Sequence, residues 1–170
     1  HSVWETVLNF MYDSTKPFTC CVTTVVPLYK VAHVLRIRAL AASCLDWMKE
    51  NLDPTLSFSI LATAISFAPG LERIENICER TIARDIEYCD KDTFLGLDLA
   101  TLKHILQYAA SDLATKKKRF RKKRKDVVSR VGVHYLRHVE AEHQEIVFLQ
   151  LVDCIHRIVL QDTFFLFGLS

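Results

Sequence analysis

The stretch that decides the fold is VVPLYKVAHVLRIRALAASCLDWMKENL, residues 25–52. Its apolar residues recur three or four positions apart, which is the spacing of one face of an α-helix. Two such stripes follow one another with a short link between them, so the stretch predicts a pair of amphipathic helices. The predicted stripes are Leu28, Val31, Ala32 and Leu35 in the first helix and Leu40, Cys44, Trp47 and Met48 in the second.

Helical spacing continues on both sides of this pair. One apolar face near the start of the chain combines Trp4, Val7, Leu8 and Met11. The β-branched residues between Phe18 and Val25 instead predict one short strand. Asp53-Pro54 is predicted to end the helix pair, and Asp98 to cap the helix that follows it. Further helices are predicted at about 3–13, 55–67, 71–89, 99–108, 126–139 and 144–159, with a short turn at 92–95.

The predicted fold class is therefore mostly α, built from antiparallel helix pairs, with at most one strand near 18–25. A chain of 170 residues can bury a core as one large domain or two small ones, and four Gly and four Pro are few for an all-β fold. No apolar run approaches the roughly 20 residues that cross a bilayer, which excludes a membrane span. An armadillo- or HEAT-type solenoid is the alternative fold, although no fixed-period repeat is visible.

The most unusual segment is KKKRFRKKRK, residues 116–125, in which nine of ten residues are basic. Without these nine, 13 of the 22 Lys and Arg remain against 20 Asp and Glu, so the positive charge is local. Repulsion between like charges predicts a solvated loop at 114–125. Three interpretations stay open: an idle loop, a nuclear-import signal, or a docking site for nucleic acid, an acidic protein or an anionic lipid. The candidate partner-binding residues are Lys116, Lys117, Lys118, Arg119, Arg121, Lys122, Lys123, Arg124 and Lys125.

The sequence gives little support for a catalytic, metal or cofactor site. His134 and His138 lie one helical turn apart with His143 nearby, but the segment matches neither HExxH nor HxxEH, so we expect surface or capping histidines. Glu72, Glu75 and Glu79 alternate with arginines and predict a solvated, salt-bridged face. No nucleotide-binding or nucleophile motif is present. We therefore predict no catalytic residues, no metal site and no cofactor.

Cysteine usage points to a reducing compartment. None of the six cysteines forms a CxxC pair, and the adjacent Cys20 and Cys21 are poorly placed to share a metal. We expect six thiols in a cytoplasmic or nuclear protein. They are Cys20, Cys21, Cys44, Cys78, Cys89 and Cys154.

The order of these segments resembles that in BTB/POZ–BACK proteins of the Kelch-like adaptor type. The segment VWETVLNFMYD (3–13) resembles the BTB helix that usually ends in Phe-Leu-Tyr-Thr-Gly. Residues 1–52 thus resemble the C-terminal part of a BTB domain. The spacing that carries the likeness to its last two helices is that of Leu28, Ala32, Leu35, Leu40, Cys44 and Leu45.

Residues 53–170 resemble a BACK domain. LERIENICERTIARDIEYC (71–89) is similar to its first long helix, and FLGLDLATLKHILQ (94–107) to the segment FLxLxLxxLxxLL. VVSRVGVHYLRHVE (127–140) and LQLVDCIHRIVLQDTFFL (149–166) resemble its later helices. The basic run has no counterpart in this pattern.

The resemblance implies a non-enzymatic interaction module. Such proteins commonly act as substrate adaptors that bridge a cullin-type ubiquitin ligase scaffold to a substrate, and they form homodimers through the first half of the BTB fold, which we expect to lie before His1. The helices near 55–67 and 71–86 would add to the cullin contact. The alternative is a structural component of a larger assembly that keeps the scaffold without ligase activity and docks an anionic partner through its basic loop.

Overall fold

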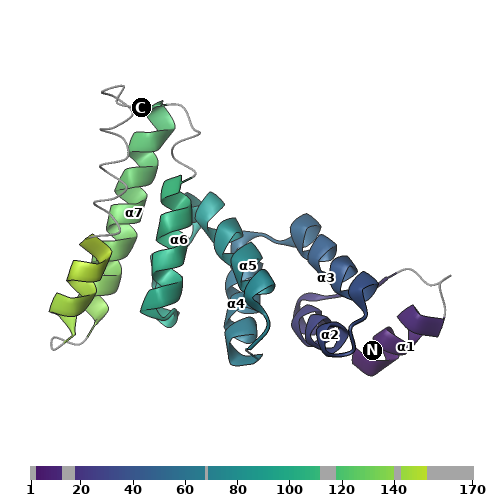
Figure 1. Cartoon of the computed structure of the whole chain (residues 1–170). Helices are drawn as coiled ribbons and strands as arrows, with labels where there is room; N and C mark the ends of the chain where they lie inside the picture. The colour runs from purple at the N-terminus through teal and green to yellow at the C-terminus, as the bar shows by residue number, and fades with distance from the viewer. Residues whose placement is uncertain (1–2, 13–17, 68, 112–117, 140–142, 153–170) are drawn as a thin grey trace, which may run out of the picture. The chain divides into compact units, whose positions relative to one another are not determined.

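The computed structural model describes residues 3–12, 18–67, 69–111, 118–139 and 143–152, of which 118–124 are described for the backbone alone. Within these ranges the chain is helical and contains no strand, so the mostly α prediction is confirmed (Figure 1). The chain divides into two compact units, His1–Cys78 and Glu79–Ser170. The helix α5 (Glu72–Arg84) carries the boundary between them.

The first unit is organised around the predicted helix pair, α2 (Val22–Val34) and α3 (Arg38–Asn51). Arg36 links them with a φ of +58°, and its N–H and that of Ile37 bond to the carbonyls of His33 and Ala32. These bonds close the end of α2 in a Schellman arrangement, for which a left-handed residue is required. The buried residues that join the pair are Val25, Val26, Leu28, Tyr29 and Ala32 from α2 and Leu40, Cys44 and Met48 from α3.

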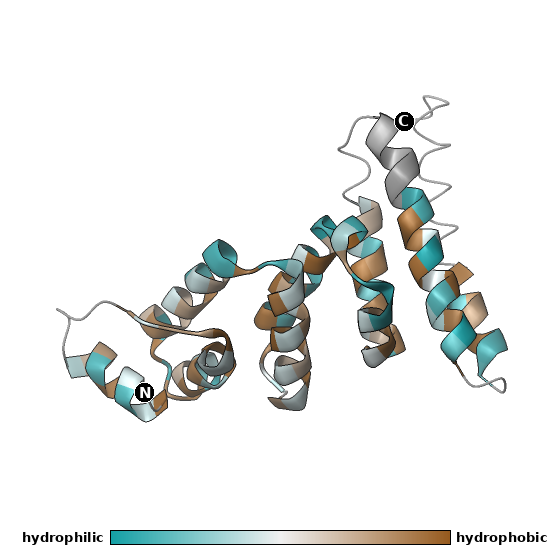
Figure 2. Ribbon diagram, turned by 180° about the vertical axis from the view of Figure 1, so that it is seen from behind, coloured by the Kyte–Doolittle hydropathy of each residue, from teal (hydrophilic) through white to brown (hydrophobic). Residues whose placement is uncertain are grey.

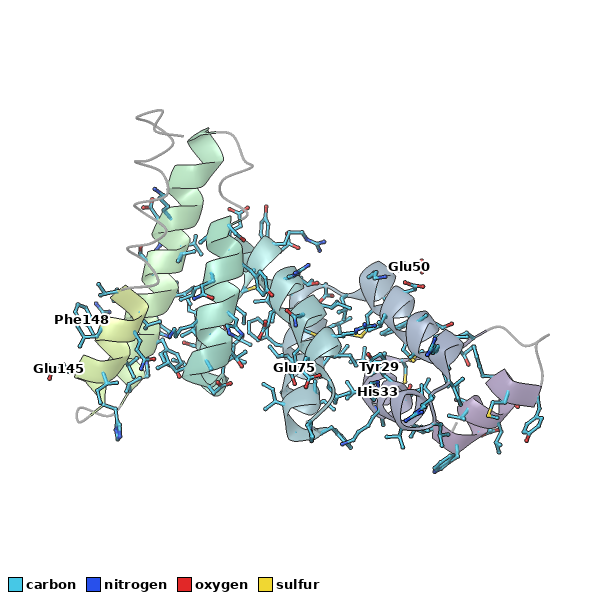
Figure 3. All side chains as sticks on the ribbon, viewed as in Figure 1. Tyr29, His33, Glu50, Glu75, Glu145 and Phe148 are labelled. Atoms are coloured by element: carbon cyan, nitrogen blue, oxygen red, sulfur yellow. The ribbon has the colours of Figure 1, made fainter. Side chains whose placement is uncertain are left out.

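Three stripe residues are less buried than the periodicity predicts. Leu35 is 47% exposed, because it lies at the end of α2, where the chain turns away from the core. Val31 and Trp47 are only partly buried. Tyr29 and His33, one turn apart on α2, stack with ring centroids 6.2 Å apart (Figure 3).

The strand predicted at 18–25 is wrong, because α2 already begins at Val22. The Cys21 N–H donates to Thr24 Oγ1 at 3.1 Å, and the Cys21 carbonyl accepts the N–H of Val25 at 2.9 Å. These bonds start a helix, and burial of Val25 and Val26 against the rest of the unit holds it. The preference of β-branched residues for strands is weak enough for such tertiary contacts to override.

Two more helices lie in the first unit, together with the start of α5. The helix α1 (Val3–Tyr12) contacts α2 and has one buried residue, Val7, and α4 (Pro54–Phe67) contacts α2 as well. Asp53 Oδ1 accepts the Leu56 N–H at 2.8 Å, so this residue both ends the helix pair, as predicted, and caps α4. Of the apolar face predicted for α1, Val7 alone is buried, whereas Trp4, Leu8 and Met11 are exposed.

The second unit contains two 3₁₀ segments, η1 (Ile86–Tyr88) and η2 (Lys91–Gly96), followed by α6 (Leu99–Ser111) and α7 (Lys118–His138). The helices α6 and α7 lie side by side, and a further helical segment spans 144–152 (Figure 1). The buried apolar side chains of the second unit are Ile82, Ala83, Ile86, Phe94, Leu97, Leu102, Ile105, Leu106, Ala109, Ala110, Val128, Val131, Val147 and Leu151.

The predicted cap of α6 is confirmed. Asp98 Oδ2 accepts the N–H groups of Ala100 at 3.0 Å and Thr101 at 3.1 Å. Partial burial acts to raise the pKa of Asp98, but the hydrogen bonds from Thr101 and Ala100 outweigh it and hold the pKa below its ordinary value. Asp98 is therefore ionised at neutral pH and interacts favourably with the helix N-terminus.

The loop predicted at 114–125 is wrong from Lys118 onward, because 118–125 form the first turns of α7. Lysine and arginine are good helix formers, since their long side chains lose little freedom in a helix. The second half of α7 is held by contacts with η1, η2 and α6, and the helix extends from there into the basic run. Figure 2 shows hydrophilic and hydrophobic residues alternating along the second half of α7.

The five cysteines in the described ranges are all thiols, and Cys154 lies outside those ranges. Burial raises the pKa of Cys44 to about 12 and that of Cys89 to about 11. Cys21 differs, because it is exposed and its sulfur lies 3.3 Å from Thr23 Oγ1 and 3.1 Å from Thr24 Oγ1. Hydrogen bonds from these hydroxyls lower the pKa of Cys21 to about 7.

We therefore expect Cys21 to be the first of the described cysteines to react with iodoacetamide, because the thiolate is the nucleophile. Its alkylation rate should rise with pH with a midpoint near 7, whereas Cys44 should stay unlabelled in the folded protein. Peptide mass spectrometry after short pulses measures both. Thr23→Val removes one hydroxyl and should move the midpoint up toward the ordinary thiol value of 9.0. A midpoint near 9 in the parent chain would contradict the assignment.

Candidate anion-binding surface on helix α7

The inward face of α7 fixes the rotation of the helix. Val128 and Val131 are buried, and the Tyr135 hydroxyl donates to the carbonyl of Leu97 at 3.1 Å. Burial, with a smaller contribution from the Asp98 carboxylate, raises the pKa of Tyr135, so the hydroxyl keeps its proton at neutral pH. Contacts with η1, η2 and α6 cover this face. Residues on the opposite side of the helix consequently face solvent.

One flank of α7, beside its inward face, and the start of η2 line an open cleft of about 350 Å³. Two arginines two helical turns apart, Arg130 and Arg137, line it together with Lys91 from η2. All three residues are exposed. Lysine and arginine side chains are cationic at neutral pH, so three positive charges lie on the surface around this cleft. Among the residues whose side chains are described, Ser129, Val133 and His134 also line it.

One carboxylate stands beside these cations. Asp92 Oδ1 lies 2.8 Å from His134 Nε2, so the imidazole donates from Nε2 to the carboxylate. This pair joins η2 to α7 next to Lys91. Arg130 donates through Nε to the Asp126 carbonyl at 3.0 Å, and its guanidinium has further N–H groups. The three basic residues that line the cleft and the Asp92 carboxylate together carry a net charge of about +2.

His134 and His138, which lie one helical turn apart, both make contacts within the second unit. His138 Nδ1 donates to the His134 carbonyl at 2.9 Å, and the two rings lie 4.6 Å apart. Together with the pair formed by Asp92, this accounts for both histidines within the second unit. Among the described residues, no group of three His, Cys, Asp or Glu is placed to hold a metal ion.

The solvated face predicted from Glu72, Glu75 and Glu79 is wrong at its last member. Glu79 is 5% exposed, and its Oε1 lies 3.5 Å from His104 Nδ1. Helical spacing places Glu79 one position after the buried Cys78, and α6 supplies the imidazole partner. Because that partner comes from another helix, spacing within α5 could not reveal the burial.

The residues predicted to bind a partner fall into three groups. Lys116 and Lys117 lie outside the described ranges. The run from Lys118 to Arg124 belongs to α7, which the structure describes there for the backbone. Lys125 is partly buried on the same helix. Lys125, the one of these nine whose side chain is described, does not line the cleft. The lysine and two arginines that do line it were missed by sequence reasoning.

Comparison with known proteins adds no relative. No protein-family model matches the chain, and neither a curated protein nor a solved structure matches it significantly. The resemblance to BTB–BACK proteins therefore stands on the order of sequence segments alone. Within the residues that the structure describes, no helix has both the length and the apolar composition of a membrane span.

Proposed function

We propose that this chain is a non-enzymatic protein–protein interaction module that acts as a BTB–BACK-type adaptor or scaffold of a cullin-type ubiquitin ligase. The observation that supports an interaction role best is the exposed apolar face of α1. Trp4 is 59%, Leu8 52% and Met11 54% exposed, and the spacing of these residues places them in one stripe. A contiguous apolar stripe on a surface helix is typical of a contact with another polypeptide.

The adaptor role predicts a second contact surface, which lies on α4 and would bind the cullin scaffold. In the BTB–BACK resemblance, the helix at 55–67 contributes to the cullin contact, and α4 occupies that position here. Its outward residues Thr55, Ser59, Ala62 and Ser66 follow helical spacing and are exposed. A large charged side chain on this face would block docking without entering the core.

We therefore expect Ala62→Arg to weaken the association of the chain with a purified cullin scaffold at least ten-fold, measured by biolayer interferometry. The circular dichroism spectrum should stay unchanged, because Ala62 is exposed. Ala100→Arg is the matched control, since Ala100 is an exposed residue on α6. If a known adaptor binds the scaffold in the same assay and the full-length protein does not, the ligase role is wrong.

A second candidate function is a structural component that docks an anionic partner without ligase activity. The observation that favours it is the cleft between η2 and α7 with its three cations. The basic run at the start of the same helix extends this charge. Retained binding of an anionic partner together with absent cullin association would favour this second function.

A further inference from the structure

Cys20 and Cys21 are adjacent in the chain, and their sulfur atoms turn toward the same side chain. Thr24 Oγ1 lies 3.8 Å from the Cys20 sulfur and 3.1 Å from the Cys21 sulfur. Consecutive side chains of an extended segment point to opposite sides, so adjacency alone predicts poor partners for a shared ion. Here α2 begins directly after Cys21, and both sulfurs reach its first turn. The structure therefore forms a converging pair of thiols that the sequence did not predict.

The pair is open to solvent and is not suited to close on itself. Cys21 is exposed and Cys20 is partly exposed, whereas Cys44 and Cys78 are buried. The Cα atoms of adjacent residues lie about 3.8 Å apart, below the roughly 4.4–6.8 Å found across disulfides, so a bond between the two sulfurs would be strained. Two thiols that converge without bonding to each other are suited to share a ligand between them.

The donor set selects the class of ligand. Thiolates are soft ligands, which favour Cu(I), zinc and iron–sulfur clusters. Structural zinc sites and iron–sulfur clusters take about four protein ligands. Among the residues that the structure describes, no third His, Cys, Asp or Glu joins this pair to form a larger metal-binding group. A monovalent soft ion is satisfied by two thiolates, so Cu(I) fits the pair better than zinc does.

We propose that Cys20 and Cys21 together bind one Cu(I) ion at the start of α2. Each thiol releases one proton to solvent as it binds the ion, and no electron is transferred. The resulting group of one monovalent cation and two thiolates is negatively charged. Negative charge is favourable at a helix N-terminus, and α2 is a helix of 13 residues that begins at Val22. A divalent ion would leave the group neutral and would gain less from this position.

Binding at this place would hold the chain segment that leads into α2. The Cys21 carbonyl accepts the N–H groups of Thr24 at 3.0 Å and Val25 at 2.9 Å. An ion that joins Cys20 to Cys21 would oppose the opening of these first bonds of the helix. We therefore expect amide hydrogen exchange of Thr24 and Val25 to slow when Cu(I) binds. This site is separate from the interaction-module function and does not depend on it.

The test is an anaerobic titration of the full reduced chain against Cu(I) held by the coloured chelator bicinchoninate. We expect the chain to withdraw Cu(I) from the chelator, with a thiolate-to-copper band that appears in the ultraviolet spectrum. Zinc is offered in parallel from a coloured zinc chelator, and we expect at least ten-fold weaker binding. Failure to withdraw Cu(I), or zinc binding of equal affinity, would overturn the proposal.

Three variants and one labelling experiment connect binding to the pair. Cys20→Ser and Cys21→Ser should each lower the affinity for Cu(I) at least ten-fold, because each removes one of the two ligands. Cys89→Ser is the matched control, since it removes a partly buried thiol from the second unit, and it should leave the affinity unchanged. In the parent chain, Cu(I) should slow the alkylation of Cys21 by iodoacetamide at least ten-fold and leave that of Cys89 unchanged.

Two outcomes of these experiments would contradict a shared ion. Loss of affinity in only one of the two serine variants would mean that a single thiol binds the ion. Unprotected alkylation of Cys21 in the parent chain would place the ion elsewhere, and this result does not depend on the folding of any variant. The cullin assay uses α4, so failure here and failure of the ligase role are separate results.

Discussion

Truncation of Phe94 to alanine is expected to destabilise the second unit by about 3–5 kcal/mol. Phe94 is 1% exposed and is the largest fully buried side chain described. Its removal deletes a ring and leaves a cavity that the short η2 segment cannot close without moving. Urea unfolding followed by amide hydrogen exchange in α6 and α7 measures the loss within this unit.

The same substitution should also loosen the packing of η2, which forms one side of the cleft. Phe94 anchors η2, and η2 supplies Lys91 and the Asp92 carboxylate that pairs with His134. Amide hydrogen exchange in η2 should therefore become faster even at temperatures where the variant stays folded. Tyr88→Ala is the matched control, because this ring is 76% exposed, and we expect its effect to stay within about 0.5 kcal/mol. A loss below about 1 kcal/mol in the Phe94 variant would show that the ring does not hold η2.

Much of the helical architecture could be predicted because its signals are local. Asp53 and Asp98 are side-chain caps, and the periodicity of 25–52 places Leu28, Leu40 and Met48 in the core. Each of these inferences depends on residues within one or two turns of each other. The errors have a different origin. The strand at 18–25 rested on a weak propensity that burial of α2 overrides, and the exposed stripe of α1 has the same periodicity as a buried one.

The cleft could not be predicted, because its parts come from distant segments. Asp92 and His134 are 42 positions apart, and their contact exists only once η2 packs on α7. The one local signal was the spacing of Arg130, His134 and Arg137, which places them on one helix face. The dense run at 116–125 drew attention away from these isolated cations, although its own place in a helix follows from the good helix propensity of Lys and Arg.

Neutralising the basic start of α7 is expected to leave the fold intact and to abolish the function of that segment. Exchange of Lys118, Arg119, Arg121 and Lys122 for glutamine keeps helix propensity and removes four charges from the helix N-terminus, where cations oppose the macrodipole. The thermal midpoint should thus stay equal or rise by a few degrees, as measured by circular dichroism. A matched variant that exchanges Lys for Arg and Arg for Lys at these four positions keeps the charge and should behave like the parent chain.

The functional outcome of this variant separates the interpretations of the basic run. If 118–125 dock an anionic partner, binding of the parent chain should fall steeply with salt, because the contact releases counterions, and the glutamine variant should lose both the affinity and most of that salt dependence. If the run is an import signal, the variant should leave the nucleus and keep its partners. A clear drop in thermal midpoint would instead mean that these charges stabilise the fold, which contradicts the repulsion expected between adjacent cations at a helix N-terminus.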